Sequence, residues 1–260
     1  MSMSTHASRW LTLPPLDGYE PSVRAQQLYC AVERIAHWLD VRIDGIDHIP
    51  DGRALLVANH AFGWDVLFVM ARLFRERGRT LWALGEHAFW KFPGLRRLAR
   101  DLGTVDGSPH NLDELLERDQ AVLVLPGGLR EAVKPRELRY RLLWGQRHGF
   151  VRAAVRHRAP IVPMACVGSD ELFDFVGDAF ARGERWLGRR GIPIPLPARL
   201  VPWPRSVALE YIIGEPLAPG VGPEQQADEA ALHRLRHEVA GALHELLDRA
   251  LARRAGIEAV

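Results

Sequence analysis

The chain has 260 residues, enough for one large α/β domain or two small ones with a sizeable core. With 34 Lys and Arg against 32 Asp and Glu, the formal charge of +2 argues against a nucleic-acid partner attracted by an overall positive field. Cys30 and Cys166 are the two cysteines, which argues against a disulfide framework and favours a reducing compartment.

The first half of the chain predicts a helix followed by strands and helices in alternation. Residues 1–20 read as a loose arm, and a helix is expected to begin at Ser22. Its expected apolar stripe consists of Val23, Leu28, Val32, Ile35, Ala36 and Leu39. The elements expected next are a strand and turn over 41–52, a buried strand over 54–58, a helix over 65–76 and a strand over 81–84.

The second half continues this alternation. Asn111, with Glu114 three residues later, resembles a capping box that opens a helix. Residues 183–205 are rich in Pro, Gly, Arg and Trp and are expected to form a long irregular surface segment. The remaining expected elements are strands over 121–125, 161–168 and 207–213, and helices over 149–159 and 224–254.

Short apolar strands alternating with helices predict an α/β fold with a mostly parallel central sheet flanked by helices. We expect an N-terminal helix before the sheet and a long C-terminal helix after it. The chain then divides into an N-terminal arm and amphipathic helix (1–40), a central domain (41–217) and a C-terminal helix packed on that domain (218–260).

The stretch LLVANHAFGWDVLF places Asn59, His60 and Asp65 inside an apolar run, where each costs free energy unless it finds a polar partner. On one continuous strand or helix, His60 and Asp65 would point in different directions. A turn through Gly63 would bring the carboxylate back to the imidazole and leave Nε2 to accept a proton. Asn59 is expected to hold this turn. A purely structural role, with Asp65 as an N-cap, stays open on these residues alone.

Four blocks in order resemble the glycerolipid acyltransferase superfamily, which includes 1-acylglycerol-3-phosphate acyltransferase. NHAFGWD is similar to its N-H-x-x-x-x-D block. The later blocks are matched by LGTVDGSPHNLDELLERDQAVLVLPGGLREAV, GFVRAAVRHRAPIVPMACVGSDELF and VALEYIIGEPL. The resemblance covers about residues 41–217 and implies a glycerolipid acyltransferase-like fold for this part of the chain.

The resemblance also implies a reaction. His60 would deprotonate an acceptor hydroxyl, which attacks the thioester of acyl-CoA or acyl-carrier protein, and Asp65 would orient His60 and stabilise the imidazolium. The acceptor would be a glycerolipid or lysophospholipid, with no covalent acyl-enzyme and no cofactor besides the co-substrate.

A second expected site is the loop LPGGLRE at 125–131, where glycines let backbone N–H groups approach an anion. In the family pattern F-P-E-G-T-R the arginine helps to hold the phosphate of the acceptor. Here Gly127 replaces the glutamate, Gly128 and Arg130 keep their positions, and Glu131 follows. The resemblance thus assigns these four residues and Asn59 to substrate binding, although Arg130 could instead pair with Glu131 or another carboxylate.

The P-G-G loop is similar to the diacylglycerol acyltransferase branch, which acylates neutral alcohols, but the H-P-H-G block of that branch is absent. A neutral-alcohol acyltransferase making diacylglycerol-derived or wax-type esters is therefore an alternative. Two further alternative functions are non-catalytic lipid binding on the same scaffold and thioester hydrolysis by a thioesterase. No H-E-x-x-H or C-x-x-C motif occurs, so we predict no metal and expect solvated histidines at 148, 157, 233, 237 and 244.

Lipid access is expected from the membrane surface. The N-terminus lacks the layout of a signal peptide, and no apolar run reaches the ~18 residues of a spanning helix, so we expect a cytoplasmic, peripherally associated protein. Candidate interfacial segments are the N-terminal helix, 186–204, and a mixed aromatic and basic stretch. That stretch contains Trp82, Phe89, Trp90, Lys91, Phe92, Leu95, Arg96, Arg97 and Arg100, and it could equally be a helix packed on the sheet.

Overall fold

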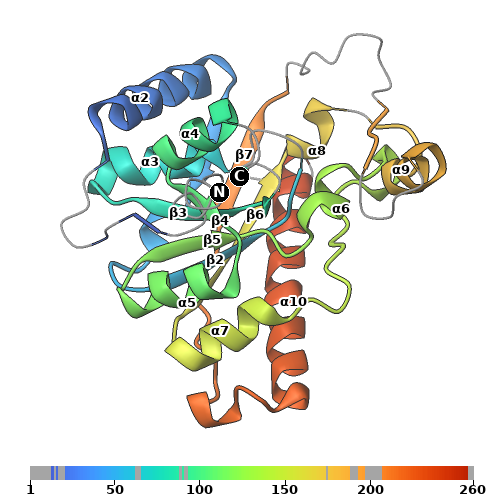
Figure 1. Ribbon diagram of the computed structural model, residues 1–260. Helices are drawn as coiled ribbons and strands as arrows, with labels where there is room; N and C mark the ends of the chain where they lie inside the picture. The colour runs from blue at the N-terminus through green and yellow to red at the C-terminus, as the bar shows by residue number, and fades with distance from the viewer. Residues whose placement is uncertain are drawn as a thin grey trace, which may run out of the picture.

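A central sheet lies between two layers of helices in the computed structural model (Figure 1). The described residues are 13, 14, 16, 21–61, 66–87, 90, 93–173, 175–187, 193–196 and 207–256. The strands are β1 (Val41–Asp44), β2 (Ala54–Ala58), β3 (Leu81–Gly85), β4 (Thr104–Asp106), β5 (Ala121–Val124), β6 (Ile161–Val167) and β7 (Leu209–Ile213).

The seven strands are ordered β1-β7-β6-β2-β5-β3-β4. Every neighbouring pair is parallel except β6 and β7, which are antiparallel. The prediction of a mostly parallel sheet flanked by helices is therefore confirmed. β1 lies within the predicted range 41–52, β2 has its predicted bounds, and β3, β5, β6 and β7 differ from theirs by one or two residues. The sequence analysis did not predict β4.

Side chains alternate between the two faces of the sheet, as the twofold period of a strand requires. In β2, Leu55 and Val57 pack against one helix layer, whereas Leu56 and Ala58 pack against the other. Because both faces of β2 are covered, all five of its residues are buried and its sequence is uniformly apolar rather than alternating.

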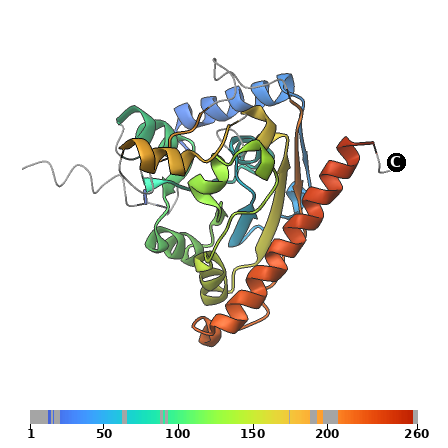
Figure 2. The same cartoon turned by 90° about the vertical axis from the view of Figure 1, so that its right-hand side faces the viewer.

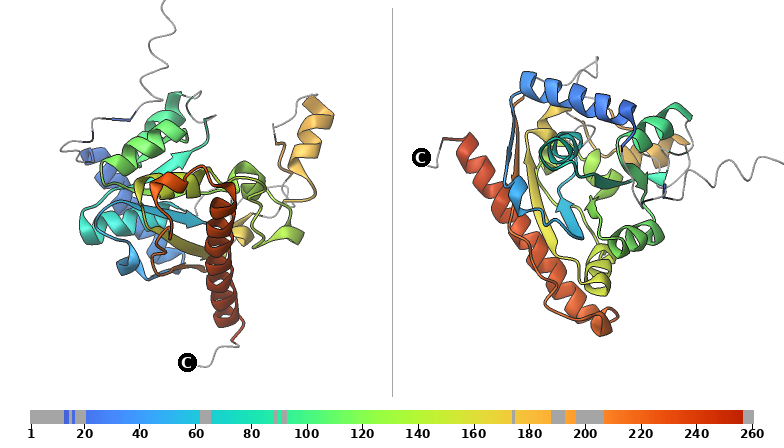
Figure 3. Two further views of the ribbon diagram at one scale, coloured as in Figure 1. Left: turned by 90° about the horizontal axis from the view of Figure 1, so that it is seen from below. Right: turned by 90° about the vertical axis from the view of Figure 1, so that its left-hand side faces the viewer.

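One layer contains α2 (Val23–Trp38) and α3 (Leu67–Arg77), and α4 (Pro93–Asp101) lies beside β4. The other layer contains α5 (Pro109–Glu117), α7 (Gly149–His157) and α10 (Glu229–Arg254). Figure 2 shows α10 as one long helix that crosses the sheet obliquely. The short helices α6 (Gly128–Ala132), α8 (Ser169–Leu172) and α9 (Ala179–Leu187) follow β5 and β6, and Figure 3 shows α9 standing apart from both layers.

The N-terminal helix begins where the sequence predicted, since the Oγ of Ser22 accepts a hydrogen bond from the N–H of Ala25 at 3.2 Å. Its buried face differs from the predicted stripe: Ala25, Tyr29, Val32 and Ala36 are buried, whereas Val23 and Ile35 are exposed. The four buried residues follow the spacing of the face that packs against α3.

Two local predictions from the sequence were wrong. Helix α5 is capped by Ser108, whose Oγ accepts from the N–H of Asn111, so Asn111 lies inside the first turn and is not the cap. Residues 183–187, expected to be irregular, belong to α9.

The predicted interfacial stretch is also corrected in part. Trp82 is fully buried in β3 and donates from Nε1 to Oε1 of Gln120 at 3.1 Å, and Trp90 is also buried. Neither side chain can reach a bilayer. Residues 88, 89, 91 and 92 lie outside the described part of the chain. No helix among the described residues has the length and apolar character needed to cross a membrane.

The packing of α10 gives a stability prediction. Leu243 is fully buried on the sheet side of α10, whereas the adjacent His244 is exposed. We expect Leu243→Ala to lower the free energy of unfolding by about 2–5 kcal/mol, because it removes apolar contacts and leaves a cavity. His244→Ala should change it by less than about 0.5 kcal/mol. Urea unfolding followed by circular dichroism measures both, and equal effects of the two changes would contradict this assignment of faces.

Candidate active site

The predicted site residues follow the carboxyl ends of β2 and β5, which are neighbours in the sheet. His60 comes two residues after β2, the P-G-G loop follows β5, and α8 follows β6 on the other side of β2. In parallel α/β sheets the carboxyl ends of adjacent strands gather loop residues at one edge, where ligands commonly bind.

Asn59 bridges β2 and β6 at this edge. Its Nδ2 donates to the carbonyl oxygen of Cys166 at 2.9 Å, and its Oδ1 accepts from the N–H of Cys166 at 2.7 Å. The side-chain amide thus makes the two hydrogen bonds that a further strand residue would have made. This explains why a buried asparagine follows an apolar strand, and it agrees with the expected role of Asn59 in holding the chain.

The backbone of His60 is held from both sides by charged side chains. Its N–H donates to Oε1 of Glu131 at 2.7 Å, and its carbonyl oxygen accepts from Nζ of Lys134 at 3.1 Å. Glu131 and Lys134 are one helical turn apart at the end of α6. Both polar groups of the His60 backbone are therefore fixed by one short segment.

Glu131 is 0% exposed, and its second oxygen, Oε2, accepts from the N–H of Leu143 at 2.8 Å. Burial raises the pKa of this carboxyl above its ordinary value, while the charge of Lys134 and the two backbone N–H donors act in the opposite direction. The carboxylate thus ties three segments together: the end of β2, α6, and the chain around Leu143.

Gly127 is required by the position of Glu131. A Cβ built on Gly127 would overlap the Glu131 side chain, including Oε2. Any side chain at position 127 would therefore push the carboxylate away from His60. Gly128 has a φ of 52°, in the left-handed region that favours glycine.

Lys134 belongs to a second buried contact. Its Nζ lies 2.9 Å from Oδ1 of Asp170, and both side chains are almost fully buried. Oδ2 of Asp170 accepts from the N–H of Tyr140 at 2.6 Å. The hydroxyl of Tyr140 donates to Oε1 of Glu171 at 2.6 Å, and burial together with this hydrogen bond raises the pKa of that hydroxyl.

The P-G-G loop is held through its carbonyl groups. Nη1 of Arg147 donates to the carbonyl oxygens of Pro126 and Gly127 at 2.8 and 2.6 Å. Arg130 is exposed, and its guanidinium lies over the ring of Phe180 in α9, 5.2 Å from the centroid. The alternative pairing of Arg130 with Glu131 is not formed: the Glu131 oxygens accept from backbone groups of His60 and Leu143.

Four of the predicted residues are brought together: Asn59, His60, Gly127 and Glu131. Asp65 and Gly63 lie outside the described residues, so the predicted contact between Asp65 and His60 stays a prediction. Sequence reasoning missed Lys134, Asp170 and Tyr140. For Lys134 a signal was present, since it follows the apolar residues Ala132 and Val133 in a segment that proved to be buried.

A recess opens beside Ala61, the residue after His60. It is lined by the Lys134–Asp170 pair and by the rings of Phe173 and Phe175, together with Ala132, Arg139 and Ser169. The rings belong to a small apolar cluster of Ala132, Val133, Phe173, Phe175, Ala179 and Phe180, which is separate from the two clusters on the faces of the sheet. Apolar surface thus lies next to the residue expected to perform chemistry.

Several known proteins are similar to this chain. A mouse protein named "DGAT1/2-independent enzyme synthesizing storage lipids" is 30% identical over 197 residues, covering 75% of this chain and 57% of its own length. An uncharacterized protein of Mycobacterium tuberculosis strain H37Rv is 32% identical over 232 residues, covering 85% of this chain and 64% of its own length. The chain thus spans less than two thirds of either relative.

Among solved structures, the crystal structure of 1-acyl-sn-glycerophosphate acyltransferase (PlsC) from Thermotoga maritima is similar with a TM-score of 0.48 at 17% identity, covering 90% of this chain and 86% of that one. The acyltransferase family model matches residues 40–167, which include β2, the P-G-G loop and all of β6. Residues 40–167 therefore match the acyltransferase family, in agreement with the resemblance of the sequence blocks to the glycerolipid acyltransferases.

Proposed function

We propose that this protein transfers a fatty acyl chain from a thioester to a hydroxyl group of a glycerolipid. The observation that carries the proposal is the immobilised backbone of His60: Glu131 and Lys134 hold its N–H and its carbonyl at the end of β2. A general base must keep its position to within a few tenths of an ångström for efficient proton transfer. The buried side chains of Glu131 and Lys134 fix the backbone of His60 in this way. All three residues lie within residues 40–167, which match the acyltransferase family model.

In the proposed reaction His60 accepts the proton of the acceptor hydroxyl, and the oxygen attacks the thioester carbonyl. The carbon–sulfur bond then breaks, and the thiolate leaves with the proton that His60 had taken. Asp65 is assigned the orientation of the imidazole and the stabilisation of its charged form. The donor is acyl-CoA or acyl-carrier protein, and the reaction needs no cofactor and no metal.

Gly127, Gly128, Arg130 and Glu131 are assigned to the acceptor side of the site. Arg130 is the exposed cation of this loop and could bind a phosphate bidentately. Glu131 contributes through His60 and not by touching the acceptor, because both of its oxygens accept from backbone N–H groups.

A second candidate acceptor is a neutral alcohol such as diacylglycerol. One observation favours it: the mouse relative is named as an enzyme that synthesizes storage lipids.

We also propose that lipid is reached from a membrane surface through α9. Four exposed apolar side chains gather on or beside this helix: Val176, Trp186, Leu187 and Leu196. The segments are joined by hydrogen bonds from the N–H of Val176 to the carbonyl of Leu196 and from Ile194 to Ala179. Phe180 of the same helix contacts Arg130, so this apolar surface adjoins the candidate site.

His60→Ala should abolish acyl transfer, a fall of at least ~100-fold, because it removes the proposed base. The assay supplies acyl-CoA with lysophosphatidic acid, diacylglycerol or a fatty alcohol, and mass spectrometry identifies the product. Circular dichroism checks that the variant is folded. Full activity of His60→Ala would overturn the mechanism, and wild-type protein that binds lipid without forming product would point to a non-catalytic binding protein.

Glu131→Gln should lower kcat by ~10–100-fold with a smaller change in KM, because an amide has one acceptor for two N–H donors and lets His60 shift. The control is Glu137→Gln, the same change in an exposed ion pair of the next segment, which should keep wild-type kinetics. The pH profile of kcat/KM separates positioning from a loss of stability: its acid limb should move when Glu131 is changed. An unmoved profile together with an unchanged kcat would refute the positioning role.

Replacing both Trp186 and Leu187 by Ala should weaken binding to vesicles of phosphatidylcholine with phosphatidylglycerol, measured by flotation. Trp186 is 65% exposed on α9, and the control Trp38→Ala removes an 82% exposed tryptophan from α2. The two helices lie on different sides of the molecule (Figure 1). Unchanged flotation of the α9 variant, or loss only in Trp38→Ala, would show that α9 is not the membrane contact.

A further inference from the structure

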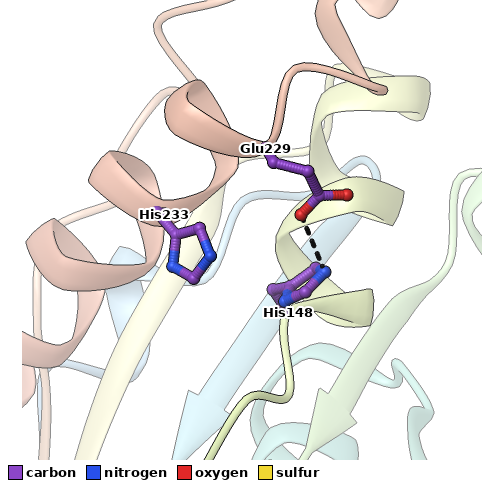
Figure 4. A group of neighbouring side chains, drawn as sticks. All are labelled: His148, Glu229 and His233. Carbon is purple, nitrogen blue, oxygen red and sulfur yellow. Dashed lines mark ion pairs between the residues drawn. The ribbon is translucent and has the colours of Figure 1, made fainter.

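Three side chains with metal-binding atoms meet where α7 and α10 begin. His148 is the N-cap of α7, and Glu229 and His233 lie one turn apart in the first turns of α10. Figure 4 shows Glu229 and His233 projecting from α10 toward His148. The two histidines are half-buried, whereas Glu229 is exposed. The expectation that His148 and His233 are simply solvated is therefore not met.

The distances are close to those of a coordination sphere. One ligand atom from each residue lies within 4.8 Å of the other two. Nε2 of His148 is 3.1 Å from Oε2 of Glu229, and the two imidazole rings have centroids 5.5 Å apart. Ligand atoms at ~2.05 Å from a tetrahedral zinc ion are about 3.3 Å from each other. The His148–Glu229 pair already has this spacing, and the short remaining approach of His233 is within the range of a side-chain rotation.

The carboxylate of Glu229 is oriented by a second contact. Arg152 holds the other carboxylate oxygen of Glu229, with Nη2 at 2.6 Å from Oε1. A hydrogen bond of this kind fixes a metal-binding carboxylate and leaves its second oxygen directed at the ion.

We propose that His148, Glu229 and His233 bind one divalent zinc ion, with solvent in the remaining position. Two imidazoles and one carboxylate form a ligand set that suits zinc. The sequence indicated no metal because it contains no contiguous motif, whereas this group is assembled from two segments far apart in the chain. The ion would join α7 to α10.

The position of the ion gives it a structural consequence. The residue before His148 is Arg147, whose guanidinium holds the carbonyls of Pro126 and Gly127. Arg236 of α10 in turn donates to the carbonyls of Gly145 and Arg147 at 2.6 and 3.2 Å. Zinc at this place would therefore brace the segment that supports the P-G-G loop.

The test uses the full chain without a histidine tag, stripped of metal by a chelator and then titrated with Zn²⁺. We expect one ion per chain and a rise in Tm of about 5–10 °C at a free zinc concentration near 100 times Kd, because zinc binds the folded state selectively. Co²⁺ should give the absorption bands of a tetrahedral site. His148→Ala and His233→Ala should each lose at least ~10-fold in affinity.

His237→Ala is the matched control, since His237 is exposed one turn further along α10, and it should bind Zn²⁺ like the wild type. Two results would overturn the proposal. One is a wild-type Tm that ~100 μM Zn²⁺ does not change. The other is equal zinc affinity of the wild type and His233→Ala, which would locate the ion elsewhere. Neither result bears on the acyl-transfer proposal, because the readouts are metal content, Tm and cobalt absorption rather than activity.

Discussion

The carboxylate of Glu131 is fully buried between the backbone N–H groups of His60 and Leu143, and the geometry of the carboxyl edge of the sheet depends on this position. A buried carboxylate is costly unless each oxygen is hydrogen-bonded and its charge is balanced. Position 127 must then be glycine, because a side chain there would overlap the carboxylate. Lys134 must lie close by, and its charge requires Asp170 in turn. One buried anion therefore determines the residue type at several positions on three loops.

Side-chain contacts of this kind also explain how backbone groups are kept in place at the carboxyl edge of the sheet, where neighbouring strands diverge. Beyond the last ladder hydrogen bonds, backbone groups of adjacent strands separate and would be left to solvent. Here side chains make hydrogen bonds in place of the ladder. The side chain of Asn59 bonds the backbone of Cys166 in β6, and the side chains of Glu131 and Lys134 bond the backbone of His60. The side chains that hold His60 are buried, whereas Arg130, which contacts Phe180 of α9, is exposed.

Much of the fold was predictable, since apolar runs such as those of β2 and β5 are short, uniform and bounded by turn residues. Composition was a poorer guide to exposure: Trp82 next to a basic stretch suggested a membrane interface, yet it lies in the core. Helix α5 begins at Ser108 rather than at Asn111, because the proline that follows Ser108 is itself favoured at the first helical position. His60, Gly127 and Glu131 were identified as site residues, but the contact of Glu131 with a backbone 71 residues away follows only from tertiary packing.

The paired hydrogen bonds between Asn59 and Cys166 fix the alignment of two strands as well as the end of one. A slip of β2 against β6 by one residue would turn every β2 side chain to the opposite face and leave the Asn59 amide without its peptide partner. Since His60 directly follows Asn59, the alignment of β2 with β6 also sets the position of His60. Strand register is usually a property of folding alone. In this protein it also determines the position of His60, the proposed proton acceptor, so substitutions at the contact between β2 and β6 should affect the proposed activity as well as stability.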